Sequence, residues 1–281
     1  MREIPVSLLT EKVKELFLTA NYEIGADIEK AIESALETEP SPIGRSVLCQ
    51  ICENYRIARD EKIAICQDTG MAVLFMEIGQ DVHFTGGNFE EAVQEGVRQA
   101  YREGYLRKSV VSDPLFDRKN TGDNTPAILH LSIVPGEKVH ILVTAKGFGS
   151  ENMSALKMLS PAQGEKGVLD FIVETAEKAG PNPCPPMVIG VGIGGTAEQA
   201  ALLAKRMTTR PAGSHHPDPR YAALEKEALR RINALGIGPA GTGGETTALC
   251  VNIASAPTHI AGLPVAVNIC CHAARHAEGE L

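Results

Sequence analysis

The stretch from Ala127 to Ala145 reads AILHLSIVPGEKVHILVTA and decides the kind of fold. Two runs rich in Ile, Leu and Val flank Pro135-Gly136, and such runs bounded by turn residues are typical of β-strands. The pattern predicts an antiparallel hairpin formed by residues 127–134 and 139–145. The elements expected on either side of this hairpin include many helices, so the fold is expected to be mixed.

Upstream of the hairpin the pattern is mainly helical. Apolar residues at Leu8, Leu9, Val13, Leu16 and Phe17 follow the spacing of one helix face, which predicts an amphipathic helix near the N-terminus. The sequence predicts further helices at residues 28–36, 43–57 and 90–105. Short apolar runs predict strands at residues 70–78 and 82–84.

Downstream, helices are expected at residues 164–178, 196–207 and 221–235, and strands at residues 187–192, 246–255 and 264–271. The predicted class is therefore α+β (mixed), with a helical N-terminal segment followed by mixed β-sheet lobes that are flanked by helices. No repeat or linker interrupts the sequence. We expect a single domain over residues 1–281, which can divide into two lobes.

Composition excludes several functional classes. The net charge of −8 and an aromatic content of 4% without Trp argue against a nucleic-acid-binding protein. No apolar run approaches the roughly 20 residues that span a bilayer, and the charged N-terminal helix is unlike a secretory signal. We therefore expect a cytoplasmic protein whose seven cysteines form no disulfides.

Three cysteine loops interrupt the regular pattern. Cys66 opens the sequence Cys-Gln-Asp-Thr-Gly, Cys184 lies within Pro181-Asn-Pro-Cys-Pro-Pro, and Cys270-Cys271 ends the last predicted strand. The prolines around Cys184 predict a rigid, extended loop. These loops contain no C-x₂₋₄-C pair, which argues against structural zinc. Cysteines at positions 49, 52 and 250 fall within predicted helices or strands and are expected to pack as small apolar residues.

Four motifs occur together and in order: Cys66-Gln-Asp-Thr-Gly, Ala145-Lys-Gly-Phe-Gly-Ser-Glu-Asn-Met, Asn182-Pro-Cys-Pro-Pro and Cys271-His-Ala-Ala-Arg. Over nearly its whole length the chain resembles the alpha subunit of class I, iron–sulfur fumarate hydratase. The related alpha subunit of L-tartrate dehydratase shares most of these motifs. The resemblance implies a [4Fe–4S] cluster held by Cys66, Cys184 and Cys271.

The resemblance also implies roles for five further residues. With only three cysteine ligands one iron is open, and it can act as a Lewis acid toward a 2-hydroxy acid. Asp68 is the candidate for proton transfer at the substrate oxygen, although a carboxylate at this position can also simply cap the turn at Gly70. The residues placed at the substrate are Gln67, Arg107, Gly149 and His259. An arginine here suits a carboxylate, and a glycine allows close approach of the backbone.

Two other patterns are weaker. Gly190-Val-Gly192-Ile-Gly-Gly195 matches a dinucleotide-binding fingerprint, but no second strand with an acidic end follows, so we interpret it as a packed turn. The pair His215-His216 looks like a metal site, yet adjacent residues seldom bind one ion together, so a plain loop is expected.

The resulting hypothesis is an alpha subunit that hydrates fumarate to (S)-malate. The alternatives are tartrate dehydration to oxaloacetate, a non-catalytic iron–sulfur sensor and, more remotely, a zinc hydrolase. Only ten residues follow Cys271, so the last apolar strand is expected to remain uncovered and to invite association. A beta subunit is the expected partner, in a symmetric α₂β₂ assembly.

Overall fold

The computed structural model describes residues 1–281, which divide into two compact units built from segments far apart in the sequence. Unit 1 comprises Met1–Gly25, Asn54–Phe148 and Arg275–Leu281, and unit 2 comprises Ala26–Glu53 and Gly149–Ala274. Both units combine helices with a sheet, so the predicted mixed α+β class is confirmed.

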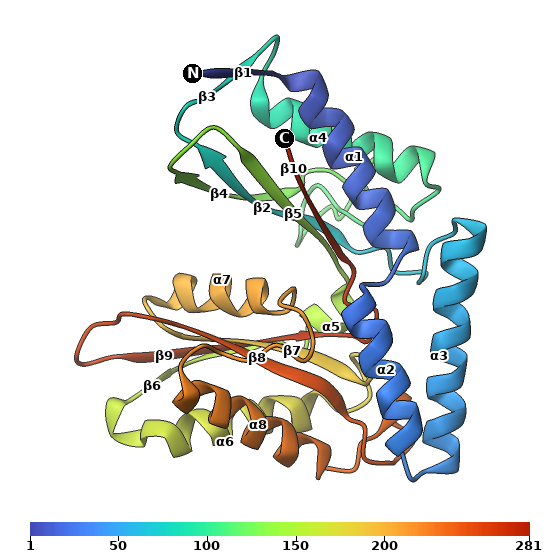
Figure 1. The fold of residues 1–281 in the computed structure, drawn as a ribbon, viewed down its shortest axis with the longest axis vertical. Helices are drawn as coiled ribbons and strands as arrows, with labels where there is room; N and C mark the ends of the chain where they lie inside the picture. The colour runs from blue at the N-terminus through green and yellow to red at the C-terminus, as the bar shows by residue number, and fades with distance from the viewer. The chain divides into compact units, whose positions relative to one another are not determined.

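Unit 1 is a helix-covered sheet. Its elements are β1 (Arg2–Pro5), α1 (Val6–Tyr22), β2 (Met71–Gly79), β3 (Val82–Thr85), α4 (Phe89–Glu103), β4 (Ile128–Val134), β5 (Val139–Lys146) and β10 (His276–Glu280). Strands β1 and β3 form a parallel pair, and the other four form a sheet in the order β10-β5-β2-β4. Helices α1 and α4 lie together on one face of that sheet (Figure 1).

The predicted apolar face of α1 forms much of the core of unit 1. Leu9, Val13 and Phe17 are fully buried and belong to the same cluster as Leu74 of β2. Leu8, which the sequence pattern places on this face, is 47% exposed instead. The buried face of α1 is therefore narrower than the sequence predicts. Successive residues of an α-helix are rotated by about 100° around its axis, so Leu8 points away from the buried Leu9.

The predicted hairpin of β4 and β5 is wrong, because β2 lies between them. Strand β2 pairs with β4 in parallel and with β5 in antiparallel orientation. Residues Ala72–Met76 are buried without a break, as expected for a central strand, whereas β4 is an edge strand with several exposed residues. The turn between β4 and β5 instead passes over the end of β2, where Gly79 donates to the carbonyl of Lys138 at 2.8 Å. A Cβ atom on Gly79 would lie 2.4 Å from the carbonyl oxygen of Gly136, so this crossing requires glycine.

Unit 2 has three layers. Its elements are α2 (Ala26–Thr38), α5 (Phe148–Glu151, at the boundary of the units), β6 (Ala155–Leu159), α6 (Gly164–Ala179), β7 (Met187–Gly194), α7 (Ala197–Met207), α8 (Pro219–Asn233), β8 (Ala248–Ala256) and β9 (Leu263–Cys270). Helix α3 (Pro42–Glu61) has residues in both units. The sheet order is β6-β9-β7-β8, with α7 on one face and α6 and α8 on the other (Figure 1).

The glycines of β7 explain the apparent nucleotide-binding fingerprint. Every residue of the strand is buried, and α7 packs directly on its backbone. A Cβ atom on Gly190 would lie 2.0 Å from the carbonyl oxygen of Ala204, and one on Gly192 would lie 2.1 Å from that of Ala200. These two glycines therefore serve close helix–sheet packing.

The last apolar strand is not uncovered, contrary to the expectation from the sequence. Strand β9 lies between β6 and β7, contacts α7, and is buried at every residue except Leu263. The chain then continues into β10, which pairs with β5. An apolar strand near the end of a sequence can be central in a sheet, and its position in the chain does not predict exposure.

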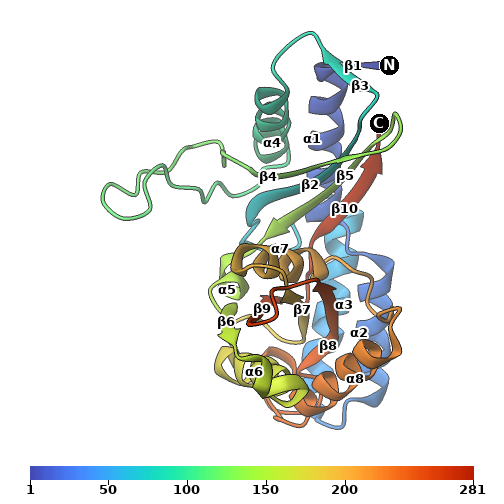
Figure 2. The same ribbon diagram turned by 90° about the vertical axis from the view of Figure 1, so that its left-hand side faces the viewer.

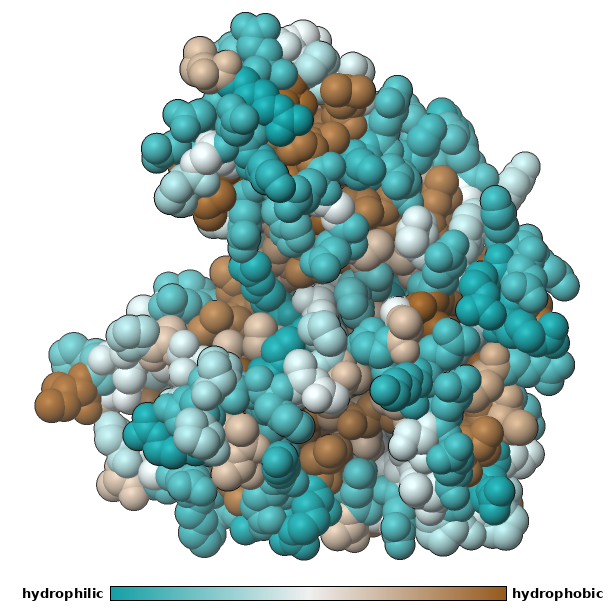
Figure 3. Space-filling model, in the orientation of Figure 1, coloured by the Kyte–Doolittle hydropathy of each residue, from teal (hydrophilic) through white to brown (hydrophobic).

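The surface shown in Figure 3 is mainly hydrophilic, with separate small apolar patches. None of the helices combines the length and the apolar character that crossing a membrane requires.

Candidate functional site

The motif Cys66–Gly70 forms a tight turn that leads directly into β2. Both carboxylate oxygens of Asp68 accept backbone N–H bonds, Oδ1 from Gly70 at 3.0 Å and Oδ2 from Phe148 at 2.9 Å. The Cys66 thiol donates to the side-chain oxygen of its neighbour Gln67 at 3.3 Å. Asp68 does cap Gly70, and because each carboxylate oxygen has a second lone pair, this role is compatible with proton transfer.

Two buried side chains that no motif indicates, Tyr101 and Asn124, donate hydrogen bonds to the main chain of this turn. The Tyr101 hydroxyl donates to the carbonyl oxygens of Thr69 at 2.7 Å and Gly70 at 3.1 Å. Burial raises the pKa of Tyr101 far above its usual range, so the hydroxyl stays protonated and remains a donor. Asn124 donates to the same Gly70 carbonyl at 3.1 Å and accepts the Ser109 N–H at 2.7 Å.

Arg107 lies beside the turn. It follows α4 at the start of the long connection, residues 104–127, that extends away from the sheet of unit 1 (Figure 2). The Thr69 hydroxyl donates to the carbonyl oxygen of Arg107 at 2.8 Å, which fixes the backbone of Arg107 next to Asp68. Arg107 is exposed, so its guanidinium is accessible to an anion from solution.

Two buried cationic residues also lie in this part of unit 1. Arg275 is 3% exposed and donates to the carbonyl oxygen of Asp68, while its Nε has no hydrogen-bond partner. Lys146 is 1% exposed. A Cβ atom on Gly147 would lie 3.1 Å from Asp68 Oδ2 and 3.2 Å from Arg275 Nη2, so the glycine leaves room for this packing. Arg275 ends the fourth motif, and Lys146 is the second residue of the motif that starts at Ala145. Membership of these motifs is the signal that could have identified both residues.

In unit 2, Cys184 and Cys271 lie at the same end of the two central strands of the sheet, β7 and β9. Cys184 precedes β7 by three residues, and Cys271 directly follows β9, which is antiparallel to β7. The His272 N–H donates to the Cys184 carbonyl oxygen at 3.5 Å, so the two loops touch. Cys270 is buried within β9, whereas Cys271 is half-buried. No cysteine of the chain is in a disulfide.

The loop of Cys184 is a turn and not the extended segment that its prolines predict. The N–H of Cys184 donates to the carbonyl oxygen of Pro181 at 3.2 Å, directly after the end of α6. Cys184 itself has φ = +54°, a left-handed conformation that is uncommon for a residue other than glycine. Such strain persists where the surroundings enforce it and is frequent at functional sites.

Of the two other predicted residues in unit 2, Gly149 lies near the Cys184 turn and His259 does not. A Cβ atom on Gly149 would lie 3.6 Å from the carbonyl oxygen of Asn182, so Gly149 adjoins the Cys184 turn. His259 follows β8 and lies at the opposite end of β7, about 20 Å away from Cys271 by strand length. There it lines a cavity of about 460 Å³ together with Tyr221, Ile260 and other residues of unit 2.

Three other cysteine and histidine residues lie outside the motifs described above: Cys250, Cys52 and His216. Cys250 is buried in β8, and burial raises the pKa of its thiol to about 12. Burial, and next to it the charge of Glu33, also raise the pKa of Cys52 in α3. His216 lies in a loop, where its Nδ1 accepts the Asp218 N–H at 3.0 Å. No group of three or more His, Cys, Asp or Glu side chains is arranged around a single metal ion.

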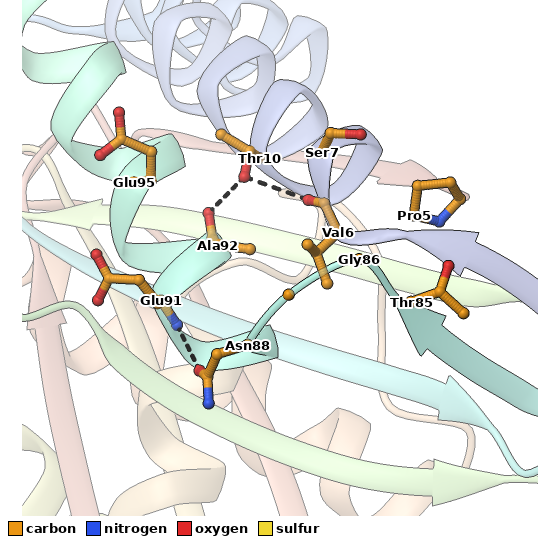
Figure 4. Close-up of a pocket in the computed structure, with 11 residues that line it drawn as sticks. Pro5, Val6, Ser7, Thr10, Thr85, Gly86, Asn88, Glu91, Ala92 and Glu95 are labelled. Carbon is orange, nitrogen blue, oxygen red and sulfur yellow. Dashed lines mark hydrogen bonds between the residues drawn. The ribbon is translucent and has the colours of Figure 1, made fainter.

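A second cavity, of about 360 Å³, lies in unit 1 where α1 and α4 begin (Figure 4). Thr10 donates to the carbonyl oxygen of Ala92 at 2.9 Å, and Asn88 accepts the N–H of Glu91 at 3.0 Å. These polar groups are thus engaged within the protein. No residue predicted for the site lines this cavity.

Comparison with known proteins shows the family of the chain. The family described as fumarate hydratase (Fumerase) matches residues 10–280. A protein of Methanocaldococcus jannaschii, provisionally named L(+)-tartrate dehydratase subunit alpha, is 42% identical over 273 residues, which is 96% of each chain. The L(+)-tartrate dehydratase subunit alpha of Escherichia coli K12 is 32% identical over 98% of this chain and 91% of its own. The chain therefore belongs to the fumarate hydratase (Fumerase) family.

Proposed function

We propose that this chain is the alpha subunit of an iron–sulfur hydro-lyase that interconverts fumarate and (S)-malate. The observation that supports this most is the turn that carries Cys66 and Asp68. Buried side chains hold its main-chain carbonyls, and the main chain of the exposed Arg107 is hydrogen-bonded to it. The reaction adds water across a carbon–carbon double bond: one carbon gains hydroxyl and its neighbour gains a proton. In reverse, the C–O bond breaks and the neighbouring carbon loses its proton.

Three cysteines, Cys66, Cys184 and Cys271, are proposed to hold a [4Fe–4S] cluster, as the resemblance implies. Their chemistry fits, because thiolates are the usual ligands of such clusters and none of these thiols is in a disulfide. The contact between the Cys184 and Cys271 loops also supports the fit. When bound, a three-cysteine cluster supplies one open iron, which acts as a Lewis acid on the substrate's oxygens.

The chain's own residues would supply positioning and proton transfer. Arg107 is suited to bind a substrate carboxylate in bidentate fashion, and Gln67 to orient the hydroxyl group. Asp68 would give a proton to, or accept one from, the substrate oxygen. Gly149 would let the backbone approach the substrate. The proposal of His259 as a substrate residue rests on the resemblance, and its place at the end of β7 opposite Cys271 gives that role no support.

A beta subunit is proposed as the partner, in an α₂β₂ assembly. This proposal rests on the relatives, which are named subunit alpha. The resemblance to class I fumarate hydratase implies that this partner supplies the group that removes the proton from carbon.

Tartrate dehydration to oxaloacetate is the second candidate. It is favoured by the names of the curated relatives. The stretch Gly149–Ala155 resembles fumarate hydratase more closely, which favours the first candidate. Turnover of (S)-malate, fumarate and L-tartrate should be measured side by side on the anaerobically purified complex. A preference for tartrate of tenfold or more in kcat/KM would replace the first candidate with the second.

The substitution Asp68→Asn tests whether the chain is an enzyme or a cluster-binding sensor. A positioned acid–base group typically contributes about 10²–10⁴-fold, so turnover should fall by that factor while the iron content stays unchanged. The control is Asp81→Asn, an exposed carboxylate in the β2–β3 turn of the same unit. Equal activity of the two variants would refute the role of Asp68.

A further inference from the structure

Glu39, at the corner between α2 and α3, has a carboxylate that is nearly inaccessible to solvent. The residue is 2% exposed. Its oxygens accept the N–H groups of Ser41 at 3.0 Å, Glu245 at 3.1 Å and Thr246 at 2.7 Å. A buried charge is costly unless hydrogen bonds replace water, and here backbone donors replace it. The carboxylate thus joins two segments that are about two hundred residues apart in the sequence.

The segment that Glu39 holds is the loop of residues 238–247, which leads into β8. Gly244 has φ = +120°, and a Cβ atom there would lie 2.3 Å from Glu39 Oε1. The loop therefore closes tightly around the carboxylate. Both the conformation and the lack of space exclude a side chain at position 244.

The same loop contacts the Cys184 turn at several points. Ala240, itself at φ = +50°, donates its N–H to the carbonyl oxygen of Pro185 at 2.9 Å. A Cβ atom on Gly241 would lie 2.3 Å from Cβ of Pro181, so the loop also presses against the start of the turn. After the turn, the Met187 N–H donates to the carbonyl oxygen of Thr247 at 2.8 Å.

We propose that Glu39 is a positioning residue for Cys184, acting through the loop of residues 238–247. The Cys184 turn is exposed and adopts a left-handed conformation, so it needs support from outside its own segment. That support comes from a loop whose far end is fixed by the Glu39 carboxylate. The inference rests on the proposed function, in which Cys184 is a cluster ligand.

The test uses the full-length chain with Glu39→Gln, an isosteric change that removes the negative charge. Glu37→Gln, at an exposed carboxylate two residues away, is the matched control. Amide hydrogen exchange of the cluster-free chain reports on the loop directly. Loss of hydrogen bonds to a charged acceptor should speed exchange at residues 245–246 by roughly tenfold to a hundredfold. Exchange should rise with it at Asn182 and Cys184, the two residues of 182–184 that carry an amide hydrogen.

Two further readouts follow the effect to the thiol and to the metal. Alkylation of Cys184 by iodoacetamide, followed by peptide mass spectrometry, should accelerate in Glu39→Gln while that of Cys66 stays constant. After anaerobic reconstitution with ferrous iron and sulfide, the variant should lose iron to a chelator several-fold faster than the control. Faster exchange at residues 245–246 with unchanged residues 182–184 and unchanged Cys184 alkylation would overturn the proposal.

A second variant guards against a simple failure to fold. Gly241→Ala leaves Glu39 intact and pushes on Pro181 from the other side of the contact, so it should loosen residues 182–184 without affecting residues 245–246 as strongly. Absence of that effect in a folded Gly241→Ala protein would also overturn the proposal. The parent assignment is tested separately by Cys184→Ala: full iron content in this variant would refute the cluster ligand, whereas the link from Glu39 to the turn would still be measured by exchange.

Discussion

Replacing Gly190 by alanine should destabilise the protein through the contact between β7 and α7. The added Cβ atom would lie 2.0 Å from the carbonyl oxygen of Ala204 and 2.8 Å from the N of Thr208. Ordinary contact begins near 3.4 Å, so α7 would have to move by 3.4 − 2.0 = 1.4 Å. Close-packed interiors accommodate such shifts poorly, and overpacking typically costs about 1–3 kcal/mol. Because the obstacle is backbone and not a flexible side chain, we expect a loss of about 3 kcal/mol.

Urea unfolding followed by far-ultraviolet circular dichroism measures this loss, and a thermal scan should show Tm lower by roughly 6–12 °C. The control is Gly262→Ala in the β8–β9 connection, where the nearest atom to the new Cβ is 3.7 Å away. Its stability should stay close to that of the unaltered chain. If Gly190→Ala were as stable as Gly262→Ala, the glycines of β7 would not be packing residues and another role would have to be sought for them.

Three other substitutions or treatments give clear expectations. Cys271→Ser should abolish cluster assembly, whereas Cys270→Ala should keep iron and activity and cost about 1–3 kcal/mol of stability; the reverse pattern of iron content in the co-expressed complex would move the ligand to Cys270. Hydro-lyase activity should decay in air and return with ferrous iron and a thiol reductant, and activity indifferent to air and chelators would contradict the cluster. Burial opposes ionisation of Glu39, but hydrogen bonds from Thr246, Ser41 and Glu245 outweigh it and lower its pKa below the usual 4.5. Its contribution to stability is therefore present at neutral pH and is lost as the pH falls below about 4.5. In Glu39→Gln, the free energy of unfolding measured in urea should fall less steeply with decreasing pH than in the unaltered chain. An equally steep fall would argue against this contribution.

The sequence predicts the helices and strands of this fold better than it predicts which strands pair with each other. Helices α1 to α4 and strands β2, β4 and β5 follow from local periodicity, which depends on residues a few positions apart. The partner of a strand depends on the whole sheet, and nothing in residues 127–145 shows that β2 lies between the two strands. The short strands β6 and β10 have no distinctive pattern and were not predicted.

The candidate site divides in the same way. Cys66 and Asp68 could be selected because they lie in a recognisable motif, and Arg107 because of its place in the family resemblance. In unit 1 the first two share one turn, and the main chain of Arg107 is hydrogen-bonded to that turn. Tyr101 was not selected, because its hydroxyl bonds to backbone carbonyls more than thirty residues away. Glu39 was missed for the same reason: a carboxylate whose partners are main-chain amides leaves no trace in the sequence of those partners.

The division of each unit among distant segments bears on how the chain folds during synthesis. Unit 1 receives its β10 strand from residues His276–Glu280, more than 120 residues after the preceding segment of the same unit ends at Phe148. On the ribosome the sheet of unit 1 therefore lacks an edge strand until residues 276–280 have emerged, while unit 2 is completed in between. Neither unit corresponds to a single excisable fragment, so expression of a contiguous half is expected to yield an unpaired strand edge and aggregation.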